Sequence, residues 1–152
     1  MKHFNILDLQ QYEALNLLCG HLLGVGVHRK VFRHAFNEKL VVKVATNSEG
    51  IRANFCELET FDWIKENEKY KHYFAAVDQL SSQGTILIQE YIPDLPAGSY
   101  KLPSFFTDLK RENFGLVRGT DGSQIVCRDY GIHLLIRDVG KPVRMVNVEF
   151  KE

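Results

Sequence analysis

The chain has 152 residues, of which 45% are hydrophobic and 25% are charged, and its formal net charge at pH 7 is zero. This length suits one domain, or two small lobes around a cleft, with a hydrophobic core. Because the charges balance, we expect no nucleic acid and no membrane among its partners. Three widely spaced cysteines without a C-x-x-C pair, and an N-terminus without a signal-peptide pattern, predict reduced, buried thiols in a cytoplasmic protein.

In chain order, an Asp-x-x-Gln start and an apolar stripe first predict a helix over residues 8–20. Glycine, β-branched and polar residues then alternate over residues 21–46, which is typical of three short antiparallel strands. Residues 50–69 carry apolar side chains at helical spacing in a charged background, so we predict a long helix there. Two further strands are expected at residues 73–80 and 85–92, with a polar turn between them.

The remaining residues have a different character. Residues 93–104 (P-D-L-P-A-G-S-Y-K-L-P-S) contain three of the four prolines and predict a linker or hinge. Beyond them the pattern predicts a hairpin that turns at residues 119–122, and a tail with one or two strands. Five antiparallel strands and one long helix therefore make an α+β lobe, followed by a smaller unit.

Two motifs in the first lobe carry residues of unusual type for a strand. L-G-V-G-V-H-R-K-V-F contains Gly24 and Gly26, which allow backbone N–H groups to approach phosphate oxygens closely, and ends near Val31. Alone this signal is weak, because paired glycines in strands often mark only a bulge or a tight turn. V-V-K-V-A places Lys43 inside an apolar strand, where a lysine costs free energy unless it has a partner.

The predicted long helix offers Lys43 two carboxylates, those of Glu57 and Glu59. Residues two apart point roughly 200° away from each other around a helix, so only one of them can face the sheet. Glu57 shares a helix face with Ile64, seven residues later. We therefore predict a Lys43–Glu57 ion pair, and the alternative is that both glutamates are solvated.

Three more motifs follow. I-L-I-Q-E-Y-I is a core strand that ends at a proline. T-D-L-K-R-E-N carries Asp108, Lys110 and Asn113, and C-R-D-Y-G carries Asp129. Each could be an ordinary turn or a chance match. Their order is more informative than any one of them, because independent coincidences in one series are improbable.

Over residues 23–131 the five motifs resemble, in order and spacing, those of protein kinases. The resemblance implies a protein-kinase-like N-lobe over residues 1–92, and a much reduced C-terminal lobe with the catalytic loop, the metal-binding loop and a short tail over residues 93–152. It implies ATP and Mg2+ as cofactors, with Gln89 as the gatekeeper beside the adenine. The residues implied to bind the nucleotide are Gly24, Gly26, Val31, Lys43 and the backbones of Glu90 and Ile92.

The same resemblance implies distinct catalytic roles. Asp108 would accept the proton of an incoming hydroxyl, and Lys110 would steady the transferred phosphate. Asn113 and Asp129 would hold Mg2+. Lys43 and Glu57 complete the implied catalytic set.

The sequence departs from the family pattern in three places. Phe106-Thr107 stands where the family has His-Arg before the catalytic aspartate, which changes how the loop is anchored. Arg29 stands in the third glycine position, where its guanidinium is expected to contact a phosphate. Only the 21 residues 132–152 follow Gly131 and none matches A-P-E, so we expect the substrate-docking lobe to be reduced.

Three functions fit these motifs. The first is a minimal kinase, a transferase that binds MgATP and passes its γ-phosphate to a hydroxyl acceptor. The second is a nucleotide-binding pseudokinase without turnover, and the third is an interaction or inhibitor protein that mimics a kinase lobe. Joint retention of the catalytic residues favours the first, and the reduced lobe favours the others. In each case a protein partner or a homo-oligomer is expected to complete the molecule.

Overall fold

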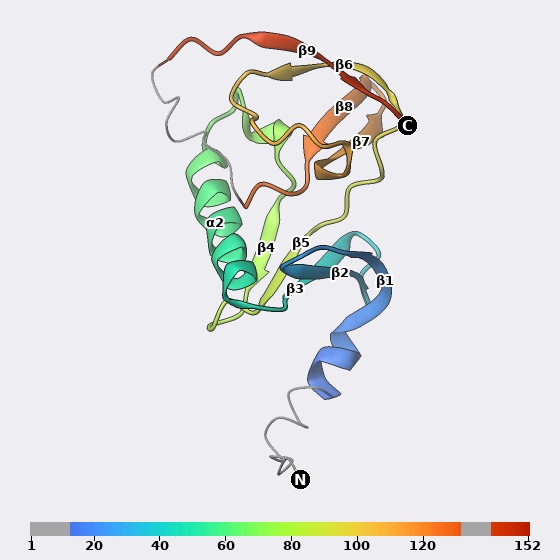
Figure 1. The fold of residues 1–152 in the computed structure, drawn as a ribbon, viewed down its shortest axis with the longest axis vertical. Helices are drawn as coiled ribbons and strands as arrows, with labels where there is room; N and C mark the ends of the chain where they lie inside the picture. The colour runs from blue at the N-terminus through green and yellow to red at the C-terminus, as the bar shows by residue number, and fades with distance from the viewer. Residues whose placement is uncertain (1–12, 132–140) are drawn as a thin grey trace.

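The computed structural model describes residues 13–131 and 141–152. They form a five-stranded antiparallel sheet with one long helix beside it, and two smaller β units beyond the sheet (Figure 1). This is the α+β arrangement of a kinase-like N-lobe, so the predicted fold class is confirmed. Of the helix predicted over residues 8–20, residues 13–18 are helical and residues 8–12 lie outside the described residues.

Strand pairing puts Lys43 in the middle of the five-stranded sheet. The strands are β1 (Cys19–Val25), β2 (Arg29–His34), β3 (Leu40–Ala45), β4 (Val77–Leu80) and β5 (Ile86–Glu90). Their order is β1-β2-β3-β5-β4, and every neighbouring pair is antiparallel. Lys43 lies on the central strand, opposite Val31 on one side and Leu87 on the other. Its side chain is therefore surrounded by protein on both flanks.

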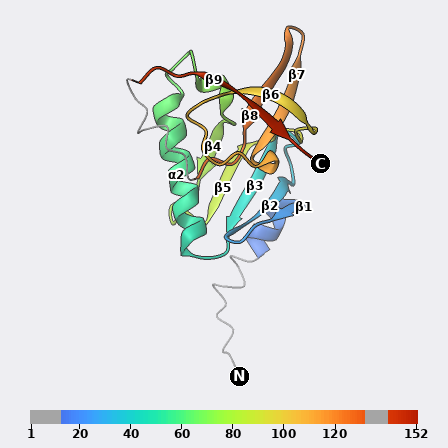
Figure 2. The same ribbon diagram turned by 45° about the horizontal axis from the view of Figure 1, so that its top comes forward.

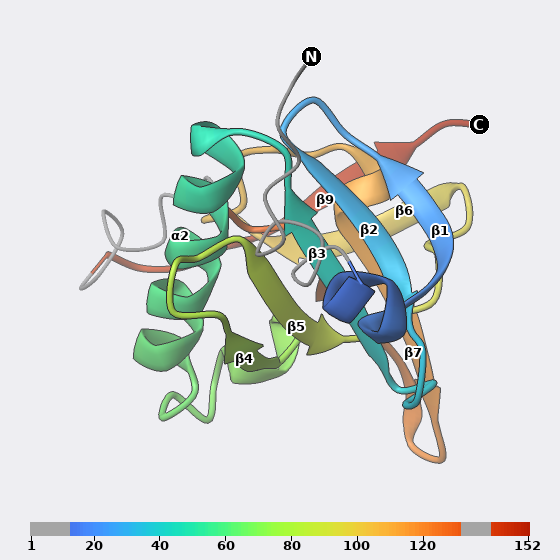
Figure 3. The same ribbon diagram turned by 90° about the horizontal axis from the view of Figure 1, so that it is seen from below.

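The helix α2 (Ser48–Ile64) packs against β3, β4 and β5, as Figures 2 and 3 show from two directions. It begins where the Asn47 side chain accepts a hydrogen bond from the backbone N–H of Gly50 at 3.0 Å, which satisfies one of the free N–H groups of the first turn. It ends at Ile64, five residues before the predicted end. A turn then runs into the short 3-10 helix η1 (Lys71–Tyr73).

The buried face of α2 is mostly polar. Its members are Gly50, Asn54, Glu57, Thr60 and Ile64. The large apolar residues Phe55 and Trp63 are instead 39% and 43% exposed. The helix therefore presents hydrogen-bonding groups to the sheet, and hydrophobicity alone does not explain its orientation.

The second part of the chain contains two β units and a short 3-10 turn. The strands β7 (Phe114–Gly119) and β8 (Gly122–Cys127) form the predicted hairpin, which follows η2 (Arg111–Asn113). The strand β6 (Gly98–Pro103) pairs with β9 (Met145–Phe150), so the prediction of a linker was wrong for these six residues. Their pairing partner lies more than 40 residues further along the chain, and local turn signals do not reveal such a strand.

An aromatic core joins these units to the helix and to the sheet. Its buried members are Ile64, Phe74, Leu95, Leu102, Phe105, Phe106, Phe114, Cys127, Tyr130 and Phe150. Phe106 and Phe114 meet edge to face with ring centroids 5.3 Å apart, an arrangement that aromatic rings favour. The core takes side chains from both sides of residue 92, and the division of the chain at that residue stays a prediction.

The cysteines contribute to packing. Cys19, Cys56 and Cys127 all remain thiols, as predicted, although only Cys127 is fully buried. Burial raises the pKa of the Cys127 thiol well above its ordinary value, so this group is unreactive at neutral pH. Among residues 13–131 and 141–152, no helix is long and apolar enough to cross a membrane.

We expect Phe114→Ala to destabilise the fold by about 3–5 kcal/mol, because the ring is fully buried among other aromatic side chains. Val117→Thr, at an exposed position of the same strand, should change the free energy of unfolding by less than about 0.5 kcal/mol. Urea denaturation of the two variants measures both values. Equal effects would contradict the assignment of this cluster as the core.

Candidate functional site

A cleft of about 400 Å³ lies between the five-stranded sheet and the second part of the chain. It is lined by the glycine-containing β1–β2 turn, by the middle of the sheet, and by the segments after β5 and β8. All of the residues predicted to bind nucleotide or metal lie on its walls: Gly24, Gly26, Val31, Lys43, Glu90, Ile92, Asn113 and Asp129. The structure brings these residues together, and their roles in binding stay predictions.

The β1–β2 turn leaves room for a ligand. The backbone N–H of Gly26 donates to the carbonyl of Arg29 at 2.8 Å and closes the turn. A Cβ added at Gly24 would meet no protein atom within 4 Å. Neither glycine has a positive φ, so the backbone at position 24 would also accept a residue with a side chain. The open space over Gly24 is part of the cleft.

The predicted ion pair between Lys43 and Glu57 is present. Lys43 Nζ lies 3.0 Å from Glu57 Oε2 and 3.1 Å from Oε1, and both residues are buried. Lys43 also donates to the backbone carbonyl of Arg128. Glu59 is exposed, as the helix geometry requires when Glu57 faces the sheet. The alternative with two solvated glutamates is therefore wrong.

Glu57 accepts hydrogen bonds from three residues besides Lys43. Its Oε1 accepts from Arg29 Nη2 at 2.8 Å and from the backbone N–H of Tyr130 at 3.1 Å. Its Oε2 accepts from the side-chain amide of Gln89 at 3.3 Å. A fully buried carboxylate is costly unless charges and hydrogen bonds compensate it, and here two cations and two N–H groups do so.

The position of Arg29 differs from the expectation. Its guanidinium points inward, with 9% of the side chain exposed, and donates to Asn54 Oδ1 at 3.1 Å and to Asp129 Oδ1 at 2.6 Å. Desolvation alone would lower the pKa of Arg29, but the charges of Glu57 and Asp129 outweigh it and raise the pKa. The Arg29 guanidinium therefore bonds to the carboxylates of Glu57 and Asp129, and it does not point to the open space over Gly24 where a phosphate was expected.

We call Arg29, Lys43, Glu57 and Asp129 the four-charge cluster.

A signal for the inward direction of Arg29 exists in the sequence, because side chains two residues apart on a strand share a face. Arg29 stands two residues before Val31, which lines the cleft. The prediction from the family position, that the Arg29 guanidinium contacts a phosphate, did not take this alternation into account.

The D-Y-G segment is fixed at its tyrosine. Besides its N–H bond to Glu57, Tyr130 donates its hydroxyl to the carbonyl of Ala75 at 2.6 Å and packs edge to face on Phe74. Partial burial alone would raise the pKa of the neighbouring Asp129 carboxyl, but the charges of Lys43 and Arg29 outweigh it and lower the pKa from 3.8 to about 2. Asp129 is therefore ionised at neutral pH.

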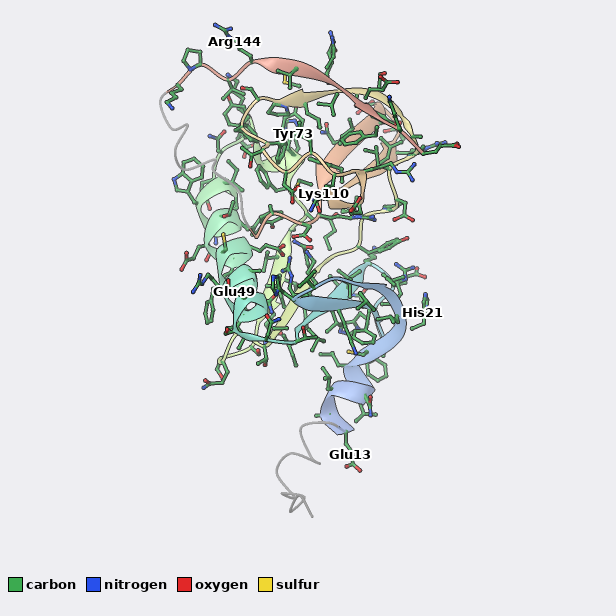
Figure 4. All side chains as sticks on the ribbon, in the orientation of Figure 1. Glu13, His21, Glu49, Tyr73, Lys110 and Arg144 are labelled. Atoms are coloured by element: carbon green, nitrogen blue, oxygen red, sulfur yellow. The ribbon has the colours of Figure 1, made fainter. Side chains whose placement is uncertain are left out.

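The predicted catalytic loop is ordered, but Asp108 and Lys110 do not line the cleft. Their side chains form an ion pair at 3.8 Å, with 39% of Asp108 and 66% of Lys110 exposed. Figure 4 shows Lys110 between the five-stranded sheet and the β6–β9 pair. The Asn113 amide donates to the carbonyl of Asp108 at 3.0 Å, and Phe106 is buried in the aromatic core. Packing of Phe106 thus anchors the loop where the family has a histidine.

Arg128 was not predicted as a site residue, and it joins three segments of the cleft wall. Its guanidinium donates to the carbonyl of Ile92 at 2.9 Å and pairs with Asp94 at 2.7 Å, and its Nε donates to the carbonyl of Glu112 at 3.0 Å. Arg128 therefore joins the segment after β5 to the segment before β7. An arginine beside Asp129 was the only signal for this role.

The predicted metal ligands fit Mg2+ only in part. Asn113 and Asp129 offer an amide and a carboxylate oxygen, which are suitable ligand types. However, one carboxylate oxygen of Asp129 already lies 2.6 Å from the Arg29 guanidinium. A divalent cation at Asp129 would be repelled by that charge at short range. This arrangement does not fit a metal centred on Asp129.

No protein-family model matches the chain, and no curated protein matches it. Among solved structures it is similar to the streptomycin–ATP–APH(2")-IIa ternary complex, with 26% identity and a TM-score of 0.46 over 60% of this chain and 30% of that chain. It is also similar to the gentamicin–APH(2")-IIa complex, with 21% identity and a TM-score of 0.45 over 64% and 31%. The chain spans less than a third of the length of these structures. The kinase-like fold rests on the strand order β1-β2-β3-β5-β4 and on the position of α2 against the sheet.

We expect Glu57→Gln to destabilise the protein by about 3–5 kcal/mol, because it leaves Lys43 and Arg29 buried without their shared carboxylate. Glu59→Gln, at an exposed position of the same helix, serves as the control and should cost less than about 0.5 kcal/mol. Chemical denaturation measures the difference. A small effect at position 57 would mean that the cations do not depend on this carboxylate.

Stability should also depend on the ionisation of Asp129. The folded-state pKa is lowered from 3.8 to about 2, so the ionised carboxylate stabilises the fold above pH 4, and this contribution is lost as the pH falls toward 2. Asp129 is half exposed and screened by solvent, so we expect its ionised carboxylate to contribute about 1 kcal/mol to the free energy of unfolding. The free-energy difference between wild type and Asp129→Asn should shrink by that amount as the pH is lowered. A difference that is constant with pH would contradict this account.

Proposed function

We propose that the chain is a kinase-like nucleotide-binding protein whose cleft takes ATP. The observation that carries this proposal is the buried Lys43–Glu57 pair on the wall of a cleft beside the open glycine turn. A lysine held rigidly by a carboxylate presents a fixed positive charge, and an anionic ligand gains most from a charge that needs no reorganisation. No protein atom lies within 4 Å of a Cβ added at Gly24, so the protein leaves the backbone open at this point.

The other wall of the cleft suits an adenine ring. Val31, Val41 and Ile92 supply apolar surface, which is what a flat heterocycle buries best. The N–H of Glu90 already donates to the carbonyl of Ala76, and the carbonyl of Ile92 already accepts from Arg128. We therefore assign the adenine hydrogen bonds to the carbonyl of Glu90 and to the N–H of Ile92.

Transfer of the γ-phosphate is the second part of the proposal. In it, a hydroxyl oxygen of the acceptor attacks the γ-phosphorus, the bond to the bridging oxygen breaks, ADP leaves, and Asp108 accepts the hydroxyl proton. The anchoring of the loop through Asn113 and Phe106, and the accessibility of Asp108, support this role. Lys110, 3.8 Å from Asp108, would steady the transferred group.

Nucleotide binding without turnover is the alternative, and two observations favour it. Neither Asp108 nor Lys110 lines the cleft in the present arrangement. In addition, Asp129 is engaged by Arg29. A protein that only binds nucleotide needs neither a catalytic base at Asp108 nor a metal ligand at Asp129.

The test is nucleotide binding followed by ADP release. ATP at a hundredfold excess over its Kd should stabilise the fold by about 2.7 kcal/mol, which for a domain of this size raises the melting temperature by about 5–11 °C. A shift with ADP release supports the transferase, provided that Asp108→Asn abolishes the release. A shift without release supports the silent nucleotide-binding protein. Absence of any shift rejects the nucleotide site and leaves the interaction protein as the explanation.

Gly24→Val gives a sharper test of the site. Because no protein atom lies within 4 Å of the added Cβ, the melting temperature without ligand should change by less than about 2 °C. The valine fills space that the phosphates are proposed to use, so ATP affinity should fall by roughly tenfold or more.

Gly119→Val, in the distant β7–β8 hairpin, is the matched control and should leave ATP affinity unchanged. Isothermal titration of the three proteins decides between the outcomes. Unchanged affinity for Gly24→Val would place the nucleotide elsewhere.

A further inference from the structure

The four-charge cluster is electrically balanced without any bound ion. Lys43 and Arg29 contribute two positive charges, and Glu57 and Asp129 contribute two negative charges. Without Arg29 the same group would carry a net negative charge on the wall of a cleft proposed to take polyphosphate. Such a site would need a bound cation before an anionic ligand could enter. Arg29 removes that need.

We propose that Arg29 supplies the positive charge at Asp129 that a divalent metal would otherwise have to supply, so that the cleft binds the nucleotide as a metal-free anion. This inference rests on the proposed nucleotide site. It concerns the form in which the nucleotide enters, and it is separate from whether the phosphate is transferred.

The guanidinium is held too firmly to be a chance surface contact. Only 9% of the Arg29 side chain is exposed, and its two terminal nitrogens bond to Asn54, Glu57 and Asp129 at 3.1, 2.8 and 2.6 Å. Asn54 is itself fixed, because its amide donates to the carbonyl of Gly84 at 2.9 Å. A planar guanidinium with several donors suits such a fixed, multiply bonded position better than an ammonium does.

The consequence for a metal follows from this arrangement. A divalent ion at Asp129 must either displace the guanidinium or approach within a few ångströms of it. Displacement would take one of two cations from the buried Glu57 and the guanidinium donor from Asn54 Oδ1, and close approach is opposed by repulsion. Asp129 remains half exposed toward the cleft, but its charge is already shared with Arg29. The site therefore offers little to a metal, and its balanced charge does not repel the anion.

The first measurement is the equilibrium affinity of the full chain for ATP in EDTA and in magnesium, by isothermal titration. We expect the two Kd values to agree within about threefold. Binding that is roughly tenfold or more tighter with magnesium overturns this inference and leaves the proposed nucleotide site intact. Absence of binding in both buffers overturns the nucleotide site, and the inference with it.

Two variants separate the role of the charge from that of the metal. Arg29→Gln should weaken binding in EDTA by roughly tenfold, and magnesium should then restore part of it. Lys30→Gln, an exposed neighbour on β2, removes the same charge and should change neither affinity. Equal behaviour of the two variants would overturn the inference.

A substitution of the buried Arg29 can disturb folding, so the half-exposed Asp129 gives a second test, Asp129→Asn, that leaves Arg29 in place. It frees the guanidinium from its carboxylate, so ATP affinity in EDTA should rise several-fold, and magnesium should add nothing. If Asp129 instead acts as a metal ligand, the variant loses affinity specifically in magnesium. That result would overturn the inference.

Discussion

The buried carboxylate of Glu57 is the interaction on which the arrangement of the first lobe depends. A carboxylate without solvent contact costs several kcal/mol unless it is paired. Its partners come from β2, β3, β5 and the D-Y-G segment, through Arg29, Lys43, Gln89 and Tyr130. If α2 rotated by one residue, the bonds to all four partners would be lost together. This shared dependence fixes the helix against the sheet, and it keeps Lys43 on the wall of the cleft.

The two parts of the chain reach order by different means. Polar contacts specify how α2 sits on the sheet, and its aromatic residues Phe55 and Trp63 stay partly in solvent. The second part instead packs aromatic rings from β6, β7, β9 and the loops into one core. Burial of these rings supplies most of the stabilisation of a domain of this size, since burial of apolar area is the dominant favourable contribution to the free energy of folding. Because Tyr130 belongs to the core and also bonds to Glu57, the core holds the polar network in place.

What the sequence could predict was set by how local each signal is. The five strands and the choice of Glu57 over Glu59 follow from alternation and helix geometry within a few residues. The strand β6 could not be found, because it pairs with β9, more than 40 residues further along the chain, and the local sequence carries no trace of that pairing. The end of α2 was placed too late, since Lys65 to Lys69 continue a helix-like composition without a glycine or proline to stop it. Arg29 was misjudged because its family position was given more weight than its place on β2.

The departure at Arg29 and the pairing of Asp129 are two aspects of one change. A glycine at position 29 would leave Asn54 Oδ1 without its guanidinium donor, Glu57 with one cation instead of two, and Asp129 without the charge of Arg29. The side chains around Arg29 therefore match an arginine and would not match the family's glycine. Matching motifs with identical spacing can thus surround a different distribution of charge. In the function proposed for this chain, the charge distribution decides which form of the nucleotide the cleft accepts, more than the presence of the motifs does.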